Sequence, residues 1–220
     1  MQTPTLLFSD DFSQLLSDFK NLPHQTVTLK KGEPLWKAGQ PYHQIFYIQD
    51  GVVQNAIEHE EGFRKILSFH GQGTVFPAYH EKQYKIEDAI ILTAMTDVTA
   101  MVFSVEDFSH LYYQNQDLQQ ATINWFSTYV NLLLYDAAHQ TYNSSLMKLA
   151  NLLFLLHKAN QKQLISLTQE ELANMLGISR VNISRHLAQL RTEGIIRISR
   201  QHIDIIDEEK LTLYCSLETV

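Results

Sequence analysis

The sequence predicts an α+β fold: an antiparallel β-roll, then one long helix, then a small helical module with a two-stranded wing. All five prolines lie at or before Pro77, and six of the eight glycines lie between Gly32 and Gly73. Frequent breakers of this kind indicate short strands and turns. No glycine then occurs before Gly177, and from Glu106 onward the apolar residues recur at helical spacing. Helices therefore follow strands along the chain.

Composition limits the class of protein. The chain has 220 residues and is 45% hydrophobic, enough to bury the core of one large domain or two small ones. No run approaches the ~18–20 apolar residues of a membrane-spanning helix, and the N-terminus does not resemble a secretory signal. A single cysteine, Cys215, excludes an intrachain disulfide and an iron–sulfur cluster held by several cysteines. We expect a cytoplasmic protein with no membrane partner.

Charge is unevenly distributed along the chain. The net charge of −7 divides into −8 for residues 1–142, +5 for residues 143–202 and −4 for residues 203–220. A basic segment within an acidic chain indicates a module that faces a polyanion. An uneven solvated surface is the alternative.

Short apolar runs in the first half predict strands. The pair Asp50-Gly51 predicts a hairpin between the second and third runs, and Glu61-Gly62 predicts a second turn. Strands about ten residues apart are typical of a sandwich or roll. The runs cover residues 26–29, 44–48, 52–57, 64–69, 89–93 and 99–103.

The long helix has two apolar stripes, so one can cover the roll while the other meets a second copy of the chain. A helix buried wholly within one subunit is the alternative. The stripe with seven-residue steps supplies the expected dimer interface: Leu118, Trp125, Thr128, Leu132, Tyr135 and His139. The adjacent stripe contains Ile123, Phe126, Val130, Leu133 and Ala137.

A polar interruption at Asn143-Ser144-Ser145 ends this helix and provides a cap for the next. We therefore expect a sensory domain over residues 1–115, a dimerisation helix over 116–142 and a third domain over 143–220.

The third domain contains two short helices and a wing. Thr168 and Glu171 form a capping box, Gly177 ends the first helix, and Ser179 caps the second. Two strands, 195–199 and 202–206, follow. This is the pattern of a winged helix–turn–helix, whose second helix reads base edges in the major groove. An ordinary helical hairpin with a solvated polar face is the alternative. The expected DNA-binding residues are Thr168, Ser179, Arg180, Val181, Asn182, Ser184, Arg185, Gln189 and Arg200.

The stretch from Leu167 to Leu187 resembles the winged helix–turn–helix of the bacterial Crp/Fnr family, the cyclic-AMP receptor protein and fumarate–nitrate regulator superfamily. The resemblance implies a homodimeric transcription regulator with a cyclic-nucleotide-binding-like β-roll and double-stranded DNA as partner. In the family, a loop near residues 157–163 can touch RNA polymerase as a further partner; an ordinary connector is the alternative. The family's recognition helix reads Ser-Arg-Glu-x-x-Ser/Gly-Arg. Ser179, Arg180, Ser184 and Arg185 match it, whereas Val181 replaces the Glu that accepts from cytosine.

The sensory half departs from the cyclic-AMP pattern of that family. Phe76-Pro77-Ala78 stands where Gly-Glu-Leu would receive the ribose, and Glu87-Asp88-Ala89 stands where Arg-Ser-Ala would hold the phosphate. Carboxylates repel an anion. We therefore expect no cyclic nucleotide as effector.

The resemblance implies an effector pocket between the roll and the long helix. A metal or haem at His43, His70 or His80 stays an open alternative, although we expect no metal site. The candidate effector-binding residues are Phe76, Tyr79, His80, Lys85, Asn124 and Thr128.

Two other classes of protein fit the sequence less well. A cupin-like metal enzyme requires a His-x-His pair, which the chain lacks. A ligand-binding regulatory subunit of another enzyme has no use for a winged module. We expect a transcription regulator without catalytic activity.

Overall fold

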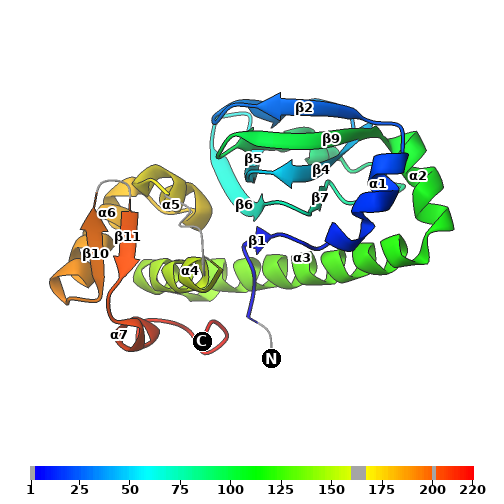
Figure 1. Cartoon of the computed structure of the whole chain (residues 1–220). Coiled ribbons are helices and arrows are strands. Elements are labelled where there is room, and N and C mark those ends of the chain that lie inside the picture. Colours follow the sequence, from blue (N-terminus) through cyan, green and yellow to red (C-terminus); the bar gives the residue numbers. More distant parts are fainter. Residues whose placement is uncertain (1–2, 160–166, 200–201) are drawn as a thin grey trace. The chain divides into compact units, whose positions relative to one another are not determined.

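The computed structural model describes residues 3–159, 167–199 and 202–220 (Figure 1). They form two compact units. One comprises Leu7–Val130, and the other comprises the described residues before Leu7 together with those from Asn131 to Val220. Helix α3 (Gln116–Tyr142) contributes to both units as one uninterrupted helix. The domain boundaries expected at 115/116 and 142/143 stay a prediction.

The first unit contains the β-roll and confirms the predicted fold class. Its five-stranded sheet has the order β1-β6-β5-β8-β3, and its four-stranded sheet has the order β2-β9-β4-β7. Only β1 and β6 pair in parallel; the other described pairs are antiparallel. The strands are β1 (Leu7–Phe8), β2 (Gln25–Leu29), β3 (Pro34–Trp36), β4 (Gln44–Asp50), β5 (Val53–Glu58), β6 (Arg64–His70), β7 (Val75–Phe76), β8 (Ile90–Ala94) and β9 (Val98–Ser104).

All six predicted strands are present, and the three missed ones (β1, β3 and β7) have only two or three residues. The hairpin predicted at Glu61-Gly62 is confirmed, because β5 and β6 pair across it. The hairpin predicted at Asp50-Gly51 is wrong, because β4 and β5 lie in different sheets. Gly51 has φ 87°, and a Cβ there would lie 2.2 Å from the Asp97 carbonyl oxygen. Glycine is therefore needed where the chain crosses between sheets beside the β8–β9 turn.

Short helices close the roll. They are η1 (Ser13–Leu15), α1 (Leu16–Asn21), η2 (Lys85–Ala89) and α2 (Val105–Gln114). Phe19 of α1 is fully buried, and its ring centroid lies 5.1 Å from that of Tyr47, 5.8 Å from that of Phe103 and 5.9 Å from that of Phe108. This aromatic cluster holds α1 and α2 against the four-stranded sheet.

The second unit contains the winged helix–turn–helix. Its apolar core includes the fully buried Leu149, Ile183, Leu190 and Leu211. The wing is confirmed as an antiparallel pair of strands, each one residue shorter than predicted. The elements are α4 (Ser145–Ala159), α5 (Gln169–Leu176), α6 (Arg180–Thr192), β10 (Ile196–Ser199), β11 (His202–Ile205) and α7 (Glu208–Thr212).

Two expectations fall outside the described residues: Arg200, and most of the loop expected near residues 157–163. In the part of the chain that the structure describes, no helix has both the length and the apolar character needed to cross a membrane.

Candidate nucleic-acid interface

Side-chain caps define both helices of the helix–turn–helix, as the sequence predicts. Thr168 Oγ1 accepts from the amide of Glu171 at 3.1 Å, and the Glu171 carboxylate accepts from the amide of Thr168 at 2.6 Å. Gly177 ends α5 in the left-handed conformation with φ 61°. Ser179 Oγ then accepts from the amide of Asn182 at 3.3 Å. Because these contacts are local, the turn between α5 and α6 follows from the sequence alone.

Helix α6 has a buried face and an exposed face. Ile183, Leu187 and Leu190 are buried in the core of the unit. Ser179, Arg180, Val181, Ser184 and Arg185 are exposed, and Asn182 is half-buried. The exposed side chains lie at the N-terminal end of α6, the part of a recognition helix that meets base edges.

The positive charge at this end of α6 is not explained by helix stability. Arg180 is the first residue of the helix, where the macrodipole is positive and a cation is unfavourable. Within the described part of the chain, neither Arg180 nor Arg185 has a carboxylate within ion-pair distance. Two unpaired guanidinium groups beside helical N–H groups suit a polyanion that comes from outside the chain.

The remaining predicted contact residues have other partners. The Gln189 side chain donates to Glu193 at 3.1 Å, and Glu193 also accepts from the hydroxyl of Tyr214 at 2.6 Å. The Thr168 hydroxyl accepts the capping hydrogen bond from the amide of Glu171. Arg197, which was not among the predicted residues, is exposed on β10 of the wing, where it alternates with apolar neighbours.

The six candidate effector residues do not form one site. Phe76 and Tyr79 are buried in aromatic packing, and the His80 ring stacks on Tyr42 with centroids 4.4 Å apart. Lys85 is exposed on η2. Asn124 and Thr128 line a separate cavity of about 260 Å³, whose described lining includes none of the other four. Phe76 packs on His70 and Trp125, with ring centroids 4.2 and 6.0 Å apart, so it lies in different surroundings from Lys85 and from the cavity of Asn124 and Thr128. Effector binding by these residues stays a prediction.

A buried polar group between the sheet and α3 was not predicted. Asn55 Nδ2 donates to the hydroxyl of Tyr129 at 3.0 Å and lies 3.3 Å from Ser68 Oγ, which lies 3.0 Å from His70 Nε2. Burial lowers the pKa of His70 to about 3, so its imidazole is neutral at pH 7. Asn55 Oδ1 and His70 Nδ1 are buried without a partner in the described structure. The pairing of β5 with β6, which sets Asn55 opposite Ser68 and Val53 opposite His70, brings these residues together.

The assignment of the dimer interface on α3 is corrected in part. Leu118, Trp125 and Leu132 are buried in the single chain, with exposed fractions of 0%, 3% and 2%, so no surface of theirs is left for a partner. Tyr135 and His139 are half-buried. Tyr135 is hydrogen-bonded to Thr219, and His139 is hydrogen-bonded to Asn151. Thr128 is half-buried and lines the cavity shared with Asn124. Three members of the adjacent stripe, Ile123, Val130 and Leu133, are exposed on α3, and so is Leu134, which the prediction did not include.

The absence of a metal site stays a prediction. Over residues 3–159, 167–199 and 202–220, no group of three His, Cys, Asp or Glu side chains is arranged for a metal ion. His43, His70 and His80 each have a different hydrogen-bond partner: the Pro41 carbonyl, Ser68 and the Lys82 carbonyl.

The β-roll, long helix and winged helix–turn–helix, with free arginines at the start of the second helix, define a DNA-binding regulator. Two family models match the chain: the Crp-like helix-turn-helix domain over residues 147–214 and the cyclic nucleotide-binding domain over residues 26–115. The chain belongs to the Crp/Fnr family of transcriptional regulators.

Individual relatives cover most of the chain. It is 25% identical over 205 residues to electron transport regulator A of Shewanella oneidensis, covering 90% of this chain and 81% of the relative. It is 23% identical to the fumarate and nitrate reduction regulatory protein of Yersinia pestis, covering 89% and 80%. FixK2 of Bradyrhizobium japonicum has the same fold, with a TM-score of 0.76 at 16% identity, covering 89% of this chain and 98% of FixK2. A CooA mutant of Carboxydothermus hydrogenoformans also has a TM-score of 0.76 at 16% identity, covering 94% and 99%.

Proposed function

We propose that the protein is a homodimeric regulator that binds a near-palindromic operator and responds to an effector bound by the β-roll, other than a cyclic nucleotide. The observation that carries this proposal is the exposed, unpaired pair Arg180 and Arg185 at the N-terminal end of α6. A planar guanidinium can bond O6 and N7 of guanine together. We propose no catalytic activity for the protein.

The exposed stripe of α3 supports the dimer. Ile123 is 58% exposed, Val130 49% and Leu134 67%. Successive members of this set are seven and four positions apart on one helix, so they form a continuous apolar seam. Two copies of this seam on parallel helices bury each other around a two-fold axis.

A two-fold dimer determines the form of the operator. Two α6 helices related by the axis enter successive major grooves on one face of the duplex, about 34 Å apart. The half-sites are then inverted copies of one short sequence. RNA polymerase, the further partner implied by the family, is proposed to meet the segment near residues 157–163, whose described part is the last turn of α4 with His157 and Lys158.

Two features of the β-roll support an effector that is not a cyclic nucleotide. Glu87 Oε1 lies 3.1 Å from His80 Nε2, and Glu87 Oε2 accepts from the amide of Tyr84 at 3.1 Å. A carboxylate held in place at the expected phosphate position disfavours an anion. The unpartnered atoms of Asn55 and His70, behind α3, suit a neutral effector that forms hydrogen bonds.

Selection from a randomised duplex library tests the proposal. Wild-type protein is expected to enrich a near-palindrome. Arg180→Ala and Arg185→Ala are each expected to relax the preference at one base pair per half-site, with a loss of about 1–3 kcal/mol in binding free energy. Arg191→Ala is the matched control, because Arg191 is an exposed arginine in the last turn of the same helix. Identical selected sequences from wild type and both variants would show that α6 does not read DNA.

A further inference from the structure

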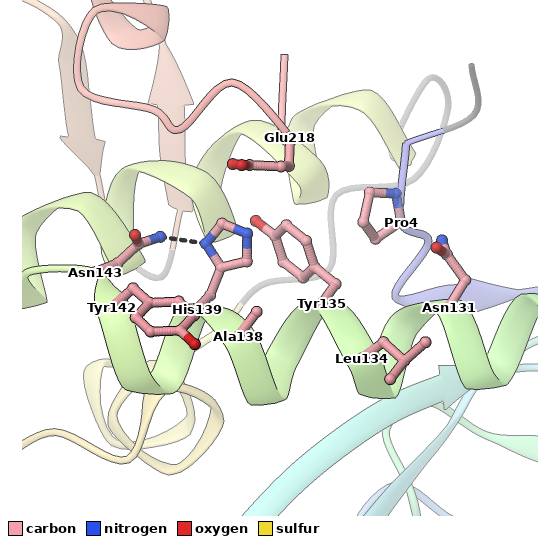
Figure 2. Close-up of a pocket in the computed structure, with 9 residues that line it drawn as sticks. All are labelled: Pro4, Asn131, Leu134, Tyr135, Ala138, His139, Tyr142, Asn143 and Glu218. Atoms are coloured by element: carbon pink, nitrogen blue, oxygen red, sulfur yellow. Dashed lines mark hydrogen bonds between the residues drawn. The ribbon is translucent and has the colours of Figure 1, made fainter.

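A second cavity, of about 420 Å³, lies in the unit that contains the winged helix–turn–helix (Figure 2). Helix α3 supplies one wall, with Leu134, Tyr135, His139 and Tyr142. Figure 2 shows Glu218, from the C-terminal segment, facing Tyr135 and His139, whose side chains rise from α3 toward it. The cavity therefore combines aromatic rings, an apolar floor and one carboxylate.

Hydrogen bonds hold the walls in place. The Tyr135 hydroxyl lies 2.6 Å from Oγ1 of Thr219, which is fully buried beside Glu218. His139 Nδ1 accepts from Asn151 Nδ2 at 3.2 Å, and the Tyr135 and His139 ring centroids are 3.8 Å apart. The C-terminal segment is thus tied to α3, so the cavity is formed before any ligand arrives.

The formal charge in the described lining of the cavity is negative. Of the described residues that line it, none is Lys or Arg, and Glu218 is the formally charged one at pH 7. Burial lowers the pKa of His139 below its ordinary value, so this imidazole is neutral at pH 7. Within the described structure Glu218 has neither an ion pair nor a side-chain hydrogen bond. Its charge is therefore available to a ligand.

We propose that this cavity binds a small organic monocation with an apolar body. The Glu218 carboxylate attracts the charge, and the faces of Tyr135 and Tyr142 add cation–π attraction. Pro4 and Ala138 accommodate the apolar part of the ligand, because Leu134, which also lines the cavity, is assigned to the proposed dimer seam. The proposal goes beyond the proposed function, because it concerns neither the β-roll effector nor DNA.

Three probes of matched size and different charge test the site by calorimetry on the full chain at pH 7.5: benzylammonium, benzyl alcohol and benzoate. Benzylammonium is expected to bind saturably, benzyl alcohol at least ~3-fold more weakly, and benzoate more weakly still. Glu218→Gln is expected to reduce benzylammonium affinity about 3-fold and to leave benzyl alcohol unchanged. Tyr142→Leu keeps an apolar side chain at an exposed position but removes the ring, and a similar loss is expected.

Glu209→Gln is the matched control, because Glu209 is an exposed glutamate of the same unit that does not line the cavity. This variant is expected to bind benzylammonium as tightly as the wild type does. Equal affinity for the three probes would overturn the proposal, as would unchanged benzylammonium binding in Glu218→Gln. Absence of saturable benzylammonium binding to the wild type, for instance because a second copy of the chain covers the cavity, would overturn it too. Operator selection depends on α6 and does not involve the cavity, so a failure of benzylammonium binding leaves the proposed reading of DNA untouched.

Discussion

Trp125 and Tyr129, one turn apart on α3, stack with ring centroids 4.9 Å apart and an interplanar angle of 10°. The ring of Phe8 lies 5.5 Å from Trp125 and 5.6 Å from Tyr129. This stack occupies the side of α3 that packs on β1, and Tyr129 extends it through a hydrogen bond to Asn55. The inner face of the helix is therefore committed to the interior of the subunit, and an intermolecular contact has to use the exposed stripe.

The first prediction follows from this division of α3. Val130→Glu places an unpaired charge in the proposed seam, at a cost of several kcal/mol on association. We expect monomers by sedimentation and a large loss of operator affinity. Ile86→Glu is the matched control, because Ile86 is an exposed apolar residue outside α3, and it should remain a dimer. If Val130→Glu sediments as a stable dimer, the exposed stripe is not the interface.

The second prediction concerns the specificity of α6. Val181 is 77% exposed and has no acceptor, so it discriminates bases through apolar contact alone. Val181→Glu restores an acceptor for cytosine N4. We expect randomised selection with this variant to shift the preferred half-site toward one that contains cytosine. Selection of the wild-type half-site by the variant would contradict a base contact at position 181.

The third prediction concerns the wing. Arg197 is exposed on β10, and we expect it to contact phosphate, which carries no sequence information. Arg197→Ala should weaken binding to all duplexes alike and reduce the slope of log K against log salt by about 0.9 for each phosphate that is no longer neutralised. Fluorescence anisotropy on operator and scrambled duplexes at several salt concentrations measures both effects. A loss confined to the operator would instead assign Arg197 to base reading.

The fourth prediction concerns the effector. Glu87, held by His80 and the Tyr84 amide, should exclude a cyclic phosphate from the β-roll. Calorimetric titration with cyclic AMP and cyclic GMP is expected to show no saturable binding at micromolar concentrations. Saturable heat in this range with either nucleotide would disprove the proposed exclusion.

The fifth prediction concerns pH. His70 is neutral in the folded protein because burial lowers its pKa to about 3, whereas in the unfolded chain it titrates near ~6.5. Protons therefore bind the unfolded state first, and stability falls as pH drops below ~6.5. His70 should contribute a loss of about 2 kcal/mol in unfolding free energy between pH 7.5 and 5. His70→Gln should lose this part of the pH dependence in urea titrations, and an unchanged dependence would show that His70 is not buried neutral.

The sequence predicted those parts of the structure that depend on near neighbours. The caps at Thr168 and Ser179 and the left-handed Gly177 involve residues within four positions of each other, so their geometry is encoded locally. The same holds for the hairpin at Glu61-Gly62. The turn at Asp50-Gly51 has an equally strong local signal, yet it joins two sheets, because the pairing of β4 with β9 and of β5 with β8 is decided by distant residues.

By itself the sequence determined the order of strands and helices, the helix–turn–helix with Arg180 and Arg185 at its reading end, and the existence of two apolar stripes on α3. Periodicity states that a helix has such stripes but not what each one faces. Only the tertiary structure placed Trp125 inside and Val130 outside, since burial depends on which strands, here β1 and β6, lie against the helix. It also brought Glu218 and Tyr142, two residues 76 positions apart, to the lining of one cavity, which no local pattern relates.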